Sequence, residues 1–376
     1  MTRWLFTALF WLSSQAANAQ LPFQSTVIAD FHEPWALAVL PDTSLLVTEK
    51  KGALQWLSAS GERLGEISGL PDVDYGGQGG LGDVVLHPDF SNNQLIYISY
   101  VEASTANTRG AAVARGKLSL QGRRPYLDEV DVIWRQYPKV LGRGHFGHRL
   151  AFDDAGFLWI SSGDRQKFTP AQHMQSTMGK LIRLHDDGSI PADNPFVNYR
   201  KENPLVDRES IYQQIWSLGH RNPLGMAHDS NGQLWVVEMG PAGGDELNLI
   251  KRGANYGYPL ASNGNHYDGR PIPEHSTRPD LQAPAASWTP VISPADLVFY
   301  QGDLFADWRG DALIAGLSAE GIVRVRIDGE QAVEVARYPL NARIRGLAEA
   351  ADGSLWVLED ERRGSPGRLL KLKPRE

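Results

Sequence analysis

The sequence contains no cysteine, and this absence excludes two kinds of site. Disulfides cannot staple the fold, and thiolates cannot hold zinc or an iron–sulfur cluster. The chain also lacks an excess of basic residues: 37 lysines and arginines stand against 44 aspartates and glutamates, for a formal net charge of −7. This balance argues against a nucleic-acid partner, which requires a basic stripe. The 376 residues must therefore build a stable core without covalent cross-links.

Long hydrophobic runs are missing as well. The apolar run over residues 4–12 follows Arg3 and has about nine residues, whereas a bilayer span requires roughly 20. Ala17-Asn18-Ala19 then provides the small-x-small pattern of a signal-peptidase site. We therefore expect residues 1–19 to be a signal peptide that is cut after Ala19. The mature chain, residues 20–376, is expected to be periplasmic or secreted and to have no membrane span.

Helical periodicity is nearly absent, and 38 glycines with 23 prolines fit a turn-rich all-β chain. One pattern recurs along the sequence: an apolar stretch, a turn of Asp, Asn and Gly, and a short β-prone run. Each copy predicts a hairpin, most clearly where the turn contains glycine, which accepts the positive φ of a tight turn. The six copies are Leu37 to Thr48, Val84 to Tyr100, Leu150 to Asp164, Met226 to Glu238, Leu297 to Leu317 and Leu347 to Glu359.

Six hairpin copies predict an all-β, six-bladed β-propeller that occupies residues 20–376 as one domain. A pair of β-sandwiches is the alternative, but no break in composition marks a linker between two domains. The mature chain offers about 60 residues per blade, more than the ~40–45 of a compact propeller repeat. The excess concentrates between Thr169 and Gln214 and between Pro241 and Pro294. We expect these insertions to wall a site on one face of the disc.

Polar residues at the ends of the apolar runs indicate where that site lies, because rigid scaffolds present functional groups on loops. His145 precedes one predicted hairpin and Asp164 ends it. A carboxylate in this position can orient an imidazole that acts as a general base, although both groups could equally be satisfied polar residues of an ordinary blade. A His-x-x-His zinc pair with His148 is disfavoured, because no third ligand or zincin glutamate is nearby.

Two other motifs point to ligand contacts. The glycine-rich run from Gly76 to Asp83 lacks the Lys-Ser/Thr of a P-loop and the spacing of a dinucleotide fingerprint. Its glycines would let the backbone approach a ligand closely while Gln78 supplies an amide; a flexible blade connection is the alternative. Arg221 and Asn222 add a fixed cation and an amide that suit a carbonyl or a carboxylate, unless the arginine forms a strand-end salt bridge.

Five segments together resemble the soluble aldose sugar dehydrogenases that depend on pyrroloquinoline quinone (PQQ), the glucose/sorbosone dehydrogenase family of six-bladed propellers. The likeness covers nearly all of the mature chain in the family's order. The segments are Gly77 to Leu81, His145 to Leu150 with Gly163-Asp164, Gly219 to Pro223, Gly240-Pro241 through Asp245-Glu246 to Ala254–Gly257, and Arg343-Ile344-Arg345.

The resemblance implies roles for individual residues. His145 matches the proton acceptor and Asp164 the carboxylate bonded to it, with Arg221 as the third catalytic group. The implied contacts of the quinone cofactor are Gln78, Arg221, Asn222, Tyr267, Arg343 and Arg345. The implied calcium ligands are the carbonyls of Gly240 and Pro241 beside the cofactor, and Glu246 and Tyr256 at a second, structural ion. Arginines suit the three carboxylates of PQQ, and oxygen ligands suit calcium.

The implied reaction is oxidation of the anomeric hydroxyl of a small aldose to a lactone, with hydride transfer to PQQ and electrons passed to an external acceptor. His145 would remove the hydroxyl proton, and Arg221 and calcium would stabilise negative charge on the quinone oxygen. The resemblance leaves a monomer or a homodimer open. Two alternatives remain: a propeller that binds sugar or protein without redox turnover, and a calcium-dependent lactonase.

Four positions depart from the family's usual pattern. His148 replaces a second glycine, and Met239 stands where glucose-oxidising members have glutamine. Ala319, beside Glu320, falls where a lysine often faces the cofactor, and Val291 where relatives offer a hydroxyl. We expect these changes to alter cofactor affinity or substrate range.

Overall fold

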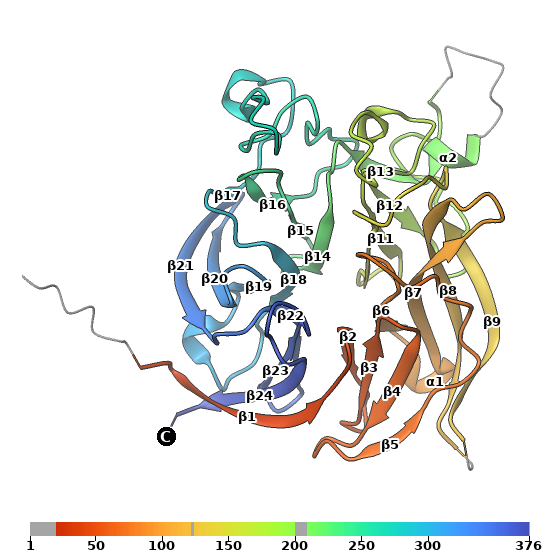
Figure 1. Ribbon diagram of the computed structural model, residues 1–376, viewed down its shortest axis with the longest axis vertical. Helices are drawn as coiled ribbons and strands as arrows, with labels where there is room; N and C mark the ends of the chain where they lie inside the picture. The colour runs from red at the N-terminus through yellow and green to blue at the C-terminus, as the bar shows by residue number, and fades with distance from the viewer. Residues whose placement is uncertain (1–19, 122–123, 200–208, 376) are drawn as a thin grey trace, which may run out of the picture.

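The chain folds into six four-stranded antiparallel sheets arranged in a ring, as the computed structural model of residues 20–121, 124–199 and 209–375 shows (Figure 1). This architecture confirms the predicted six-bladed β-propeller and excludes two β-sandwiches. The predicted signal peptide and its cleavage site lie outside the described residues. Within the described ranges, no helix is long and apolar enough to cross a membrane.

The blades follow one another along the chain. The first two are β2 (Pro34–Val39), β3 (Leu45–Glu49), β4 (Ala53–Leu57), β5 (Arg63–Glu66) and β6 (Leu81–Leu86), β7 (Leu95–Ala103), β8 (Arg109–Ser119), β9 (Tyr126–Arg135). The next two are β10 (Gly147–Phe152), β11 (Leu158–Ser162), β12 (Lys180–Leu184), β13 (Ile215–Leu218) and β14 (Pro223–His228), β15 (Leu234–Glu238), β16 (Asp245–Leu249), β17 (Ala286–Trp288). The fifth is β18 (Pro294–Phe299), β19 (Ala312–Gly316), β20 (Gly321–Asp328), β21 (Gln331–Pro339). Short helices are α1 (Phe90–Asn93), α2 (Glu209–Gln213), η1 (Thr169–Gln172), η2 (His275–Thr277) and η3 (Ala306–Trp308).

The sixth blade joins the two ends of the chain. Its strands are β22 (Ile344–Glu349), β23 (Leu355–Glu359), β24 (Arg368–Pro374) and β1 (Phe23–Asp30). β1 pairs antiparallel with β24 from Phe23 opposite Pro374 to Asp30 opposite Arg368. Figure 1 shows the red and blue ends of the chain side by side in this blade. The ring is therefore closed by hydrogen bonds between the first strand and the last.

The six predicted hairpins are the first two strands of the six blades. In two of them an aspartate before the turn fixes a tryptophan six residues later: Asp153 Oδ2 accepts from Trp159 Nε1 (2.8 Å), and Asp229 Oδ2 from Trp235 Nε1 (3.1 Å). Both aspartates also accept a backbone N–H within the turn. The repeated Asp-to-Trp spacing is thus a structural device of the blade.

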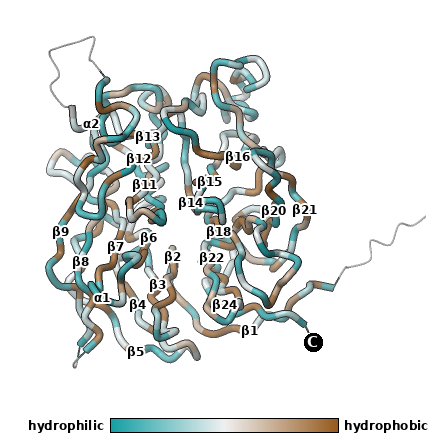
Figure 2. Tube along the Cα trace, turned by 180° about the vertical axis from the view of Figure 1, so that it is seen from behind, coloured by the Kyte–Doolittle hydropathy of each residue, from teal (hydrophilic) through white to brown (hydrophobic). Residues whose placement is uncertain are grey.

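The hydrophobic core lies between the blades, because each sheet is covered on both faces by its neighbours. In β7, Ile96 and Ile98 pack toward the first blade, while Tyr97 between them packs toward the third. This follows from the two-residue period of a strand, which sends alternate side chains to opposite faces. Figure 2 shows much of the hydrophobic colouring on strands. The buried clusters pair neighbouring blades around the ring.

Arg149 joins the blades near the start of β10, where its side chain is 5% exposed. Its guanidinium contacts four other blades, at Trp35, Asp83, Leu224 and Ala295. Asp296, 3.6 Å from Arg149 Nε, accepts from the backbone N–H of Leu347 in the sixth blade (3.0 Å). One buried cation and two carboxylates therefore link all six blades.

The two insertions behave differently. Tyr258, His266 and Tyr267 of the second insertion line a cavity with His145, as predicted. The described part of the first insertion, from Thr169 to Gln214, lines neither of the cavities at the site described below, so that part of the prediction is wrong. Before β12, at the Asp164 end, Gln172 of the insertion donates to the carbonyl of Tyr258 and does not itself line the cavity. For the segment after Leu184 the reason is the direction of β12, which begins beside Ser162 and ends beside Leu158 at the far end of β11. The long connection to β13 therefore leaves from the end of the blade that is remote from Asp164.

Candidate active site

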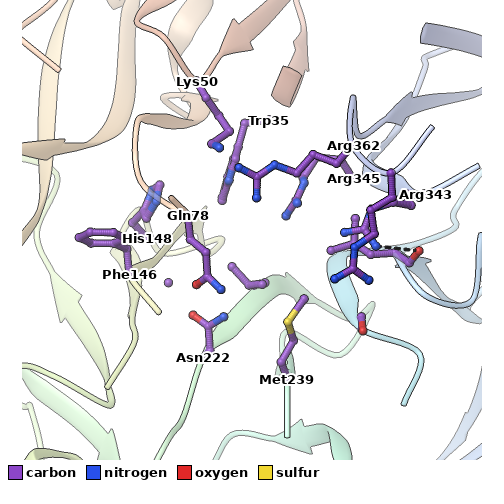
Figure 3. Close-up of a pocket in the computed structure, with 15 residues that line it drawn as sticks. Trp35, Lys50, Gln78, Phe146, His148, Asn222, Met239, Arg343, Arg345 and Arg362 are labelled. Carbon is purple, nitrogen blue, oxygen red and sulfur yellow. Dashed lines mark hydrogen bonds between the residues drawn. The ribbon is translucent and has the colours of Figure 1, made fainter. Parts of the chain in front are cut away.

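Two adjoining cavities lie where the first strand of each blade begins and the second ends. The cationic cavity has a volume of about 260 Å³. It is lined by residues at these strand ends from several blades, including Lys50 after β3, Asn222 before β14, Met239 after β15 and Arg345 in β22 (Figure 3). The histidine cavity, about 240 Å³, is lined by His145, Gln166, Phe168, Arg221, Pro241, Tyr258, His266, Tyr267, Asp268 and Arg270. They meet where Gln78 Oε1 accepts from the backbone N–H of His145 (2.6 Å) and where Asn222 follows Arg221.

His145 and Asp164 form the predicted pair. His145 Nδ1 lies 2.7 Å from Asp164 Oδ1, and the Asp164 side chain is fully buried. Asp164 is held in turn by the backbone N–H groups of Gln166 (3.0 Å) and Phe168 (3.2 Å). His145 has a φ of 47°, in the left-handed region that a histidine adopts only at some cost in energy. The backbone is thus constrained where it presents this ring.

The contact with Asp164 decides which ring nitrogen of His145 is basic. A carboxylate accepts the Nδ1 hydrogen, which leaves Nε2 unprotonated in the neutral ring. Burial lowers the pKa of His145, partly opposed by the hydrogen bond to Asp164 and assisted by the charge of Arg221. The neutral, proton-accepting ring is therefore favoured at neutral pH.

Arg221 is fixed by a buried carboxylate that the sequence did not single out as a site residue. Glu238 Oε2 accepts from the backbone N–H of Arg221 (2.6 Å), and Oε1 accepts from His220 Nδ1 (2.9 Å). The guanidinium donates from Nη1 to the carbonyl of Met239 (2.9 Å) and from Nη2 to the hydroxyl of Tyr267 (3.3 Å). Its Nε is buried and has no partner among the described residues. The Nε donor of the cation is therefore available to a ligand.

Arg343 and Arg345 share one carboxylate. Asp360 Oδ2 accepts from Arg343 Nε (3.0 Å), and Oδ1 accepts from Arg345 Nη2 (3.2 Å). These positive charges lower the pKa of Asp360 against the opposing effect of burial. Two cations against one anion leave an excess of positive charge on this wall, and Arg345 Nε is another buried atom without a partner in the described chain.

The structure divides the predicted cofactor contacts between the two cavities. Gln78, Asn222, Arg343 and Arg345 line the cationic cavity. Arg221 and Tyr267 line the histidine cavity, where the Tyr267 side chain is 76% exposed. His145 thus lies with Arg221 and Tyr267, next to the cavity that holds the other predicted contacts.

Two of the four departures from the family pattern, His148 and Met239, line the cationic cavity. The ring of His148 stacks on Trp35 (centroids 4.9 Å apart), and its Nδ1 lies 2.8 Å from Ser99 Oγ. Burial lowers the pKa of His148 to about 3, so the ring is neutral. A Cβ on Gly82 would lie 2.0 Å from His148 Cε1, which means that this glycine provides the space for the ring. His148 therefore borders the cationic cavity, rather than standing beside the base in the histidine cavity.

The other three departures have different positions. Met239 lines the cationic cavity, whereas Ala319, Glu320 and Val291 line neither cavity. Ala319 packs against the hydrophobic cluster between the fourth and fifth blades, and Glu320 is exposed. The expected effect of Glu320 on the field at the site is therefore weakened by solvent.

Three of the four predicted calcium ligands line a small cavity of about 10 Å³. Gly240, Pro241 and Glu246 line it together with Glu238. Burial raises the pKa of Glu246, and the neighbouring charge of Glu238 raises it further. Tyr256 does not line it: its carbonyl lies 3.1 Å from His275 Nε2, and His275 Nδ1 lies 3.9 Å from Glu246 Oε1. No group of three or more acidic, histidine or cysteine side chains that could hold a metal occurs among the described residues.

Several lining residues escaped the sequence reasoning. They are Trp35, Lys50, Arg362 and Arg363 in the cationic cavity, and Gln166, Phe168, Tyr258 and His266 in the histidine cavity. For Lys50 a signal existed: it follows the second strand of its hairpin, as Asp164 and Met239 follow theirs. Trp35 lies in β2, whereas Phe168, Tyr258 and His266 come from loops whose paths depend on neighbouring blades.

Comparisons with known proteins point to one family. The model of the family described as Glucose / Sorbosone dehydrogenase matches residues 31–371 of the chain. The chain is 38% identical over 374 residues to aldose sugar dehydrogenase YliI of Escherichia coli (strain K12), covering 98% of this chain and 97% of that protein. It resembles the structure of the soluble aldose sugar dehydrogenase of Escherichia coli in the apo-form with a TM-score of 0.84 and 37% identity, covering 94% and 100% of the two chains. For the PQQ-bound aldose sugar dehydrogenase of Streptomyces coelicolor, the TM-score is 0.74 and the identity 27%, with 94% and 98% covered.

Proposed function

The chain belongs to the glucose/sorbosone dehydrogenase family, and we propose that it is a PQQ-dependent oxidoreductase that converts the anomeric hydroxyl of an aldose to a lactone. The observation that carries the proposal is His145, whose Nδ1 is bonded to buried Asp164 while its ring faces a cavity that adjoins a strongly cationic one. Electrons would pass from the reduced cofactor to an external acceptor. The leader pattern at residues 1–19 supports a periplasmic or secreted location.

The residues present fit PQQ. Three buried polar atoms beside the cavities lack hydrogen-bond partners in the described chain: Arg221 Nε, Asn222 Oδ1 and Arg345 Nε. An unsatisfied buried polar group costs about 1–3 kcal/mol, so a polar ligand at this place would offset a real penalty. Gln78, Asn222, Arg343 and Arg345 would hold the carboxylates and ring edge, while Arg221 and Tyr267 would contact the cofactor from the histidine cavity. Bound PQQ supplies a quinone that accepts a hydride.

The protein's own contribution is proton transfer and orientation. His145 would accept the proton of the anomeric hydroxyl at Nε2, while Asp164 fixes the ring and offsets the charge that the imidazole acquires. The guanidinium of Arg221 donates to the carbonyl of Met239, while Glu238 fixes the backbone N–H of the same residue. The guanidinium would thus present a fixed positive charge where negative charge develops during the reaction. The aromatic rings of Phe168, Tyr258 and Tyr267 give the histidine cavity apolar walls that can pack against a sugar ring.

Calcium is proposed at the carbonyls of Gly240 and Pro241. A cavity of about 10 Å³ is close to the volume that one water-sized particle needs, and its carbonyl and carboxylate lining suits a hard cation. Asp245 accepts the backbone N–H of Gly240 (2.8 Å) and so braces this turn. The second proposed ion, at Glu246 and Tyr256, would require His275 to move, because its ring contacts both residues.

The test is reconstitution. Purified protein is incubated with PQQ and calcium, and reduction of an artificial dye is followed with a panel of aldoses beside a relative of known activity. Dye reduction that needs PQQ and sugar is the expected result. Absence of PQQ binding and of dye reduction would refute the proposal, and lactone cleavage with calcium alone would favour a hydrolase instead.

A further inference from the structure

The cationic cavity contains more positive charge than the predicted cofactor contacts account for. Five cations line it, Lys50, Arg343, Arg345, Arg362 and Arg363, and no aspartate or glutamate is among its lining residues. Figure 3 shows Lys50, Arg362, Arg345 and Arg343 along one side, with Gln78, Asn222 and Met239 across from them. Like charges gathered in one cavity repel each other, and an anionic ligand would relieve this repulsion.

Lys50 and Arg362 share one carboxylate and one carbonyl. Glu33 Oε1 lies 3.2 Å from Lys50 Nζ and 3.3 Å from an Arg362 nitrogen. Both cations also donate to the carbonyl of Gly77, at 3.1 Å from Lys50 Nζ and 3.0 Å from Arg362 Nη2. Gly77 directly precedes Gln78, so the two cations also hold the loop that carries a predicted cofactor contact. An ammonium has three hydrogens, and Lys50 therefore retains one for a ligand.

Arg363 has no hydrogen bond or ion pair within the described residues, although its side chain borders the cavity. Its φ of 55° lies in the left-handed region, which is unfavourable for an L-residue and which glycine adopts freely. An arginine at a position that favours glycine points to a role for its side chain. The exposed end of the β23–β24 loop thus presents two adjacent guanidinium groups at the cavity.

The charges can be counted from these contacts. Five cations line the cavity, and two carboxylates touch them: Glu33 at Lys50 and Arg362, and Asp360 at Arg343 and Arg345. His148 contributes no charge, since its pKa is lowered to about 3. The cavity therefore has an excess of three positive charges, which equals the number of carboxylates on PQQ.

We propose that Lys50, Arg362 and Arg363, here called the outer cations, bind a carboxylate of PQQ that Arg343 and Arg345 do not neutralise. The inference rests on the proposed function, and it assigns this recognition to the β23–β24 loop and to the residue after β3. The outer cations complete the charge balance that three carboxylates require, which Arg343 and Arg345 cannot do because Asp360 already neutralises one of their two charges.

The experiment measures PQQ binding by calorimetry with purified, metal-loaded protein. Arg363→Gln is expected to weaken binding about tenfold, and the double variant Arg362→Gln/Arg363→Gln about 100-fold, as for the loss of one and two charge-assisted contacts. Arg337→Gln is the matched control. It removes the same charge from a half-exposed arginine of β21 that pairs with Glu334 and lines neither cavity, and it should leave binding within about twofold of wild type.

A second ligand separates charge from shape. The trimethyl ester of PQQ has no carboxylate charge, so wild type and both variants should bind it with equal affinity. Thermal melts of the apo-proteins verify folding, and Arg363→Gln provides the test if loss of the Arg362 contacts unfolds the double variant.

The outcomes are distinct. If wild type binds PQQ and both variants bind it as tightly as Arg337→Gln does, the inference is overturned while the proposed function stands. Equal weakening toward PQQ and the ester would also overturn it. Failure of wild type to bind PQQ would remove the proposed function and the inference with it.

Discussion

Replacing Asp164 with asparagine isolates the electrostatic part of its role. The carboxylate lies 2.7 Å from His145 Nδ1, which puts the two charge centres about 4 Å apart once the imidazole is protonated. At an effective dielectric of 20, this pair is worth about 4 kcal/mol. Since 1.36 kcal/mol corresponds to a tenfold change in rate, Asp164→Asn should lower turnover by about 10³-fold. The amide oxygen can still accept a backbone N–H of the loop, so the fold should persist.

Steady-state dye reduction with a saturating aldose provides the assay, and calorimetry verifies that PQQ still binds. Asp153→Asn is the control, because Asp153 also accepts a backbone N–H and stands at the turn end of the same hairpin, remote from His145. The control should keep wild-type turnover. A loss below tenfold for Asp164→Asn, with wild-type PQQ affinity, would refute the reasoning that this carboxylate stabilises the protonated base.

Two further predictions concern the base His145, and a third concerns Arg149, which links the six blades. His145→Ala should lower turnover by about 10²–10⁴ without weakening PQQ binding measured by calorimetry, and unchanged turnover would remove His145 from the mechanism. Because burial lowers the pKa of His145, the neutral base should persist into mild acid: the acid limb of kcat/KM should have its midpoint below the ordinary imidazole value of about 6.5, and a midpoint above that value would contradict this assignment. Arg149→Met should lower the free energy of unfolding by about 3–5 kcal/mol in denaturant titrations, because buried Asp83 and Asp296 would lose their cation; a loss under about 1 kcal/mol would mean that water or protonation compensates.

The fold was predictable because its signal is local and repeated. A hairpin can be recognised from a few neighbouring residues, and each blade begins with one hairpin. The contacts of Asp153 with Trp159 and of Asp229 with Trp235 illustrate this. The pairing of His145 with Asp164 was predictable for a related reason. Both residues flank one hairpin, and the antiparallel pairing of β10 and β11 brings its open ends together.

Contacts between blades were harder to predict. Arg362 and Gly77 are separated by 285 residues, and they meet only because β1 and β24 close the ring. Tyr267 lies on an insertion of irregular structure, so the residues did not indicate that it would reach Arg221. The neutral state of His148 likewise depends on complete burial against Trp35 and on the space left by Gly82, which no short stretch of sequence encodes.

The pairing of β1 with β24 also determines when, during synthesis, the propeller ring can close. Synthesis delivers β1 first and β24 last, so the sixth blade lacks a strand until the entire chain has emerged. The cavity walls formed by Lys50 and Arg362 come from the first and last blades, and this join brings them together. A chain truncated before β24 would therefore lose part of the wall of the cationic cavity along with its last strand, even with most blades intact. Ring closure thus makes ligand binding a property of the finished chain alone.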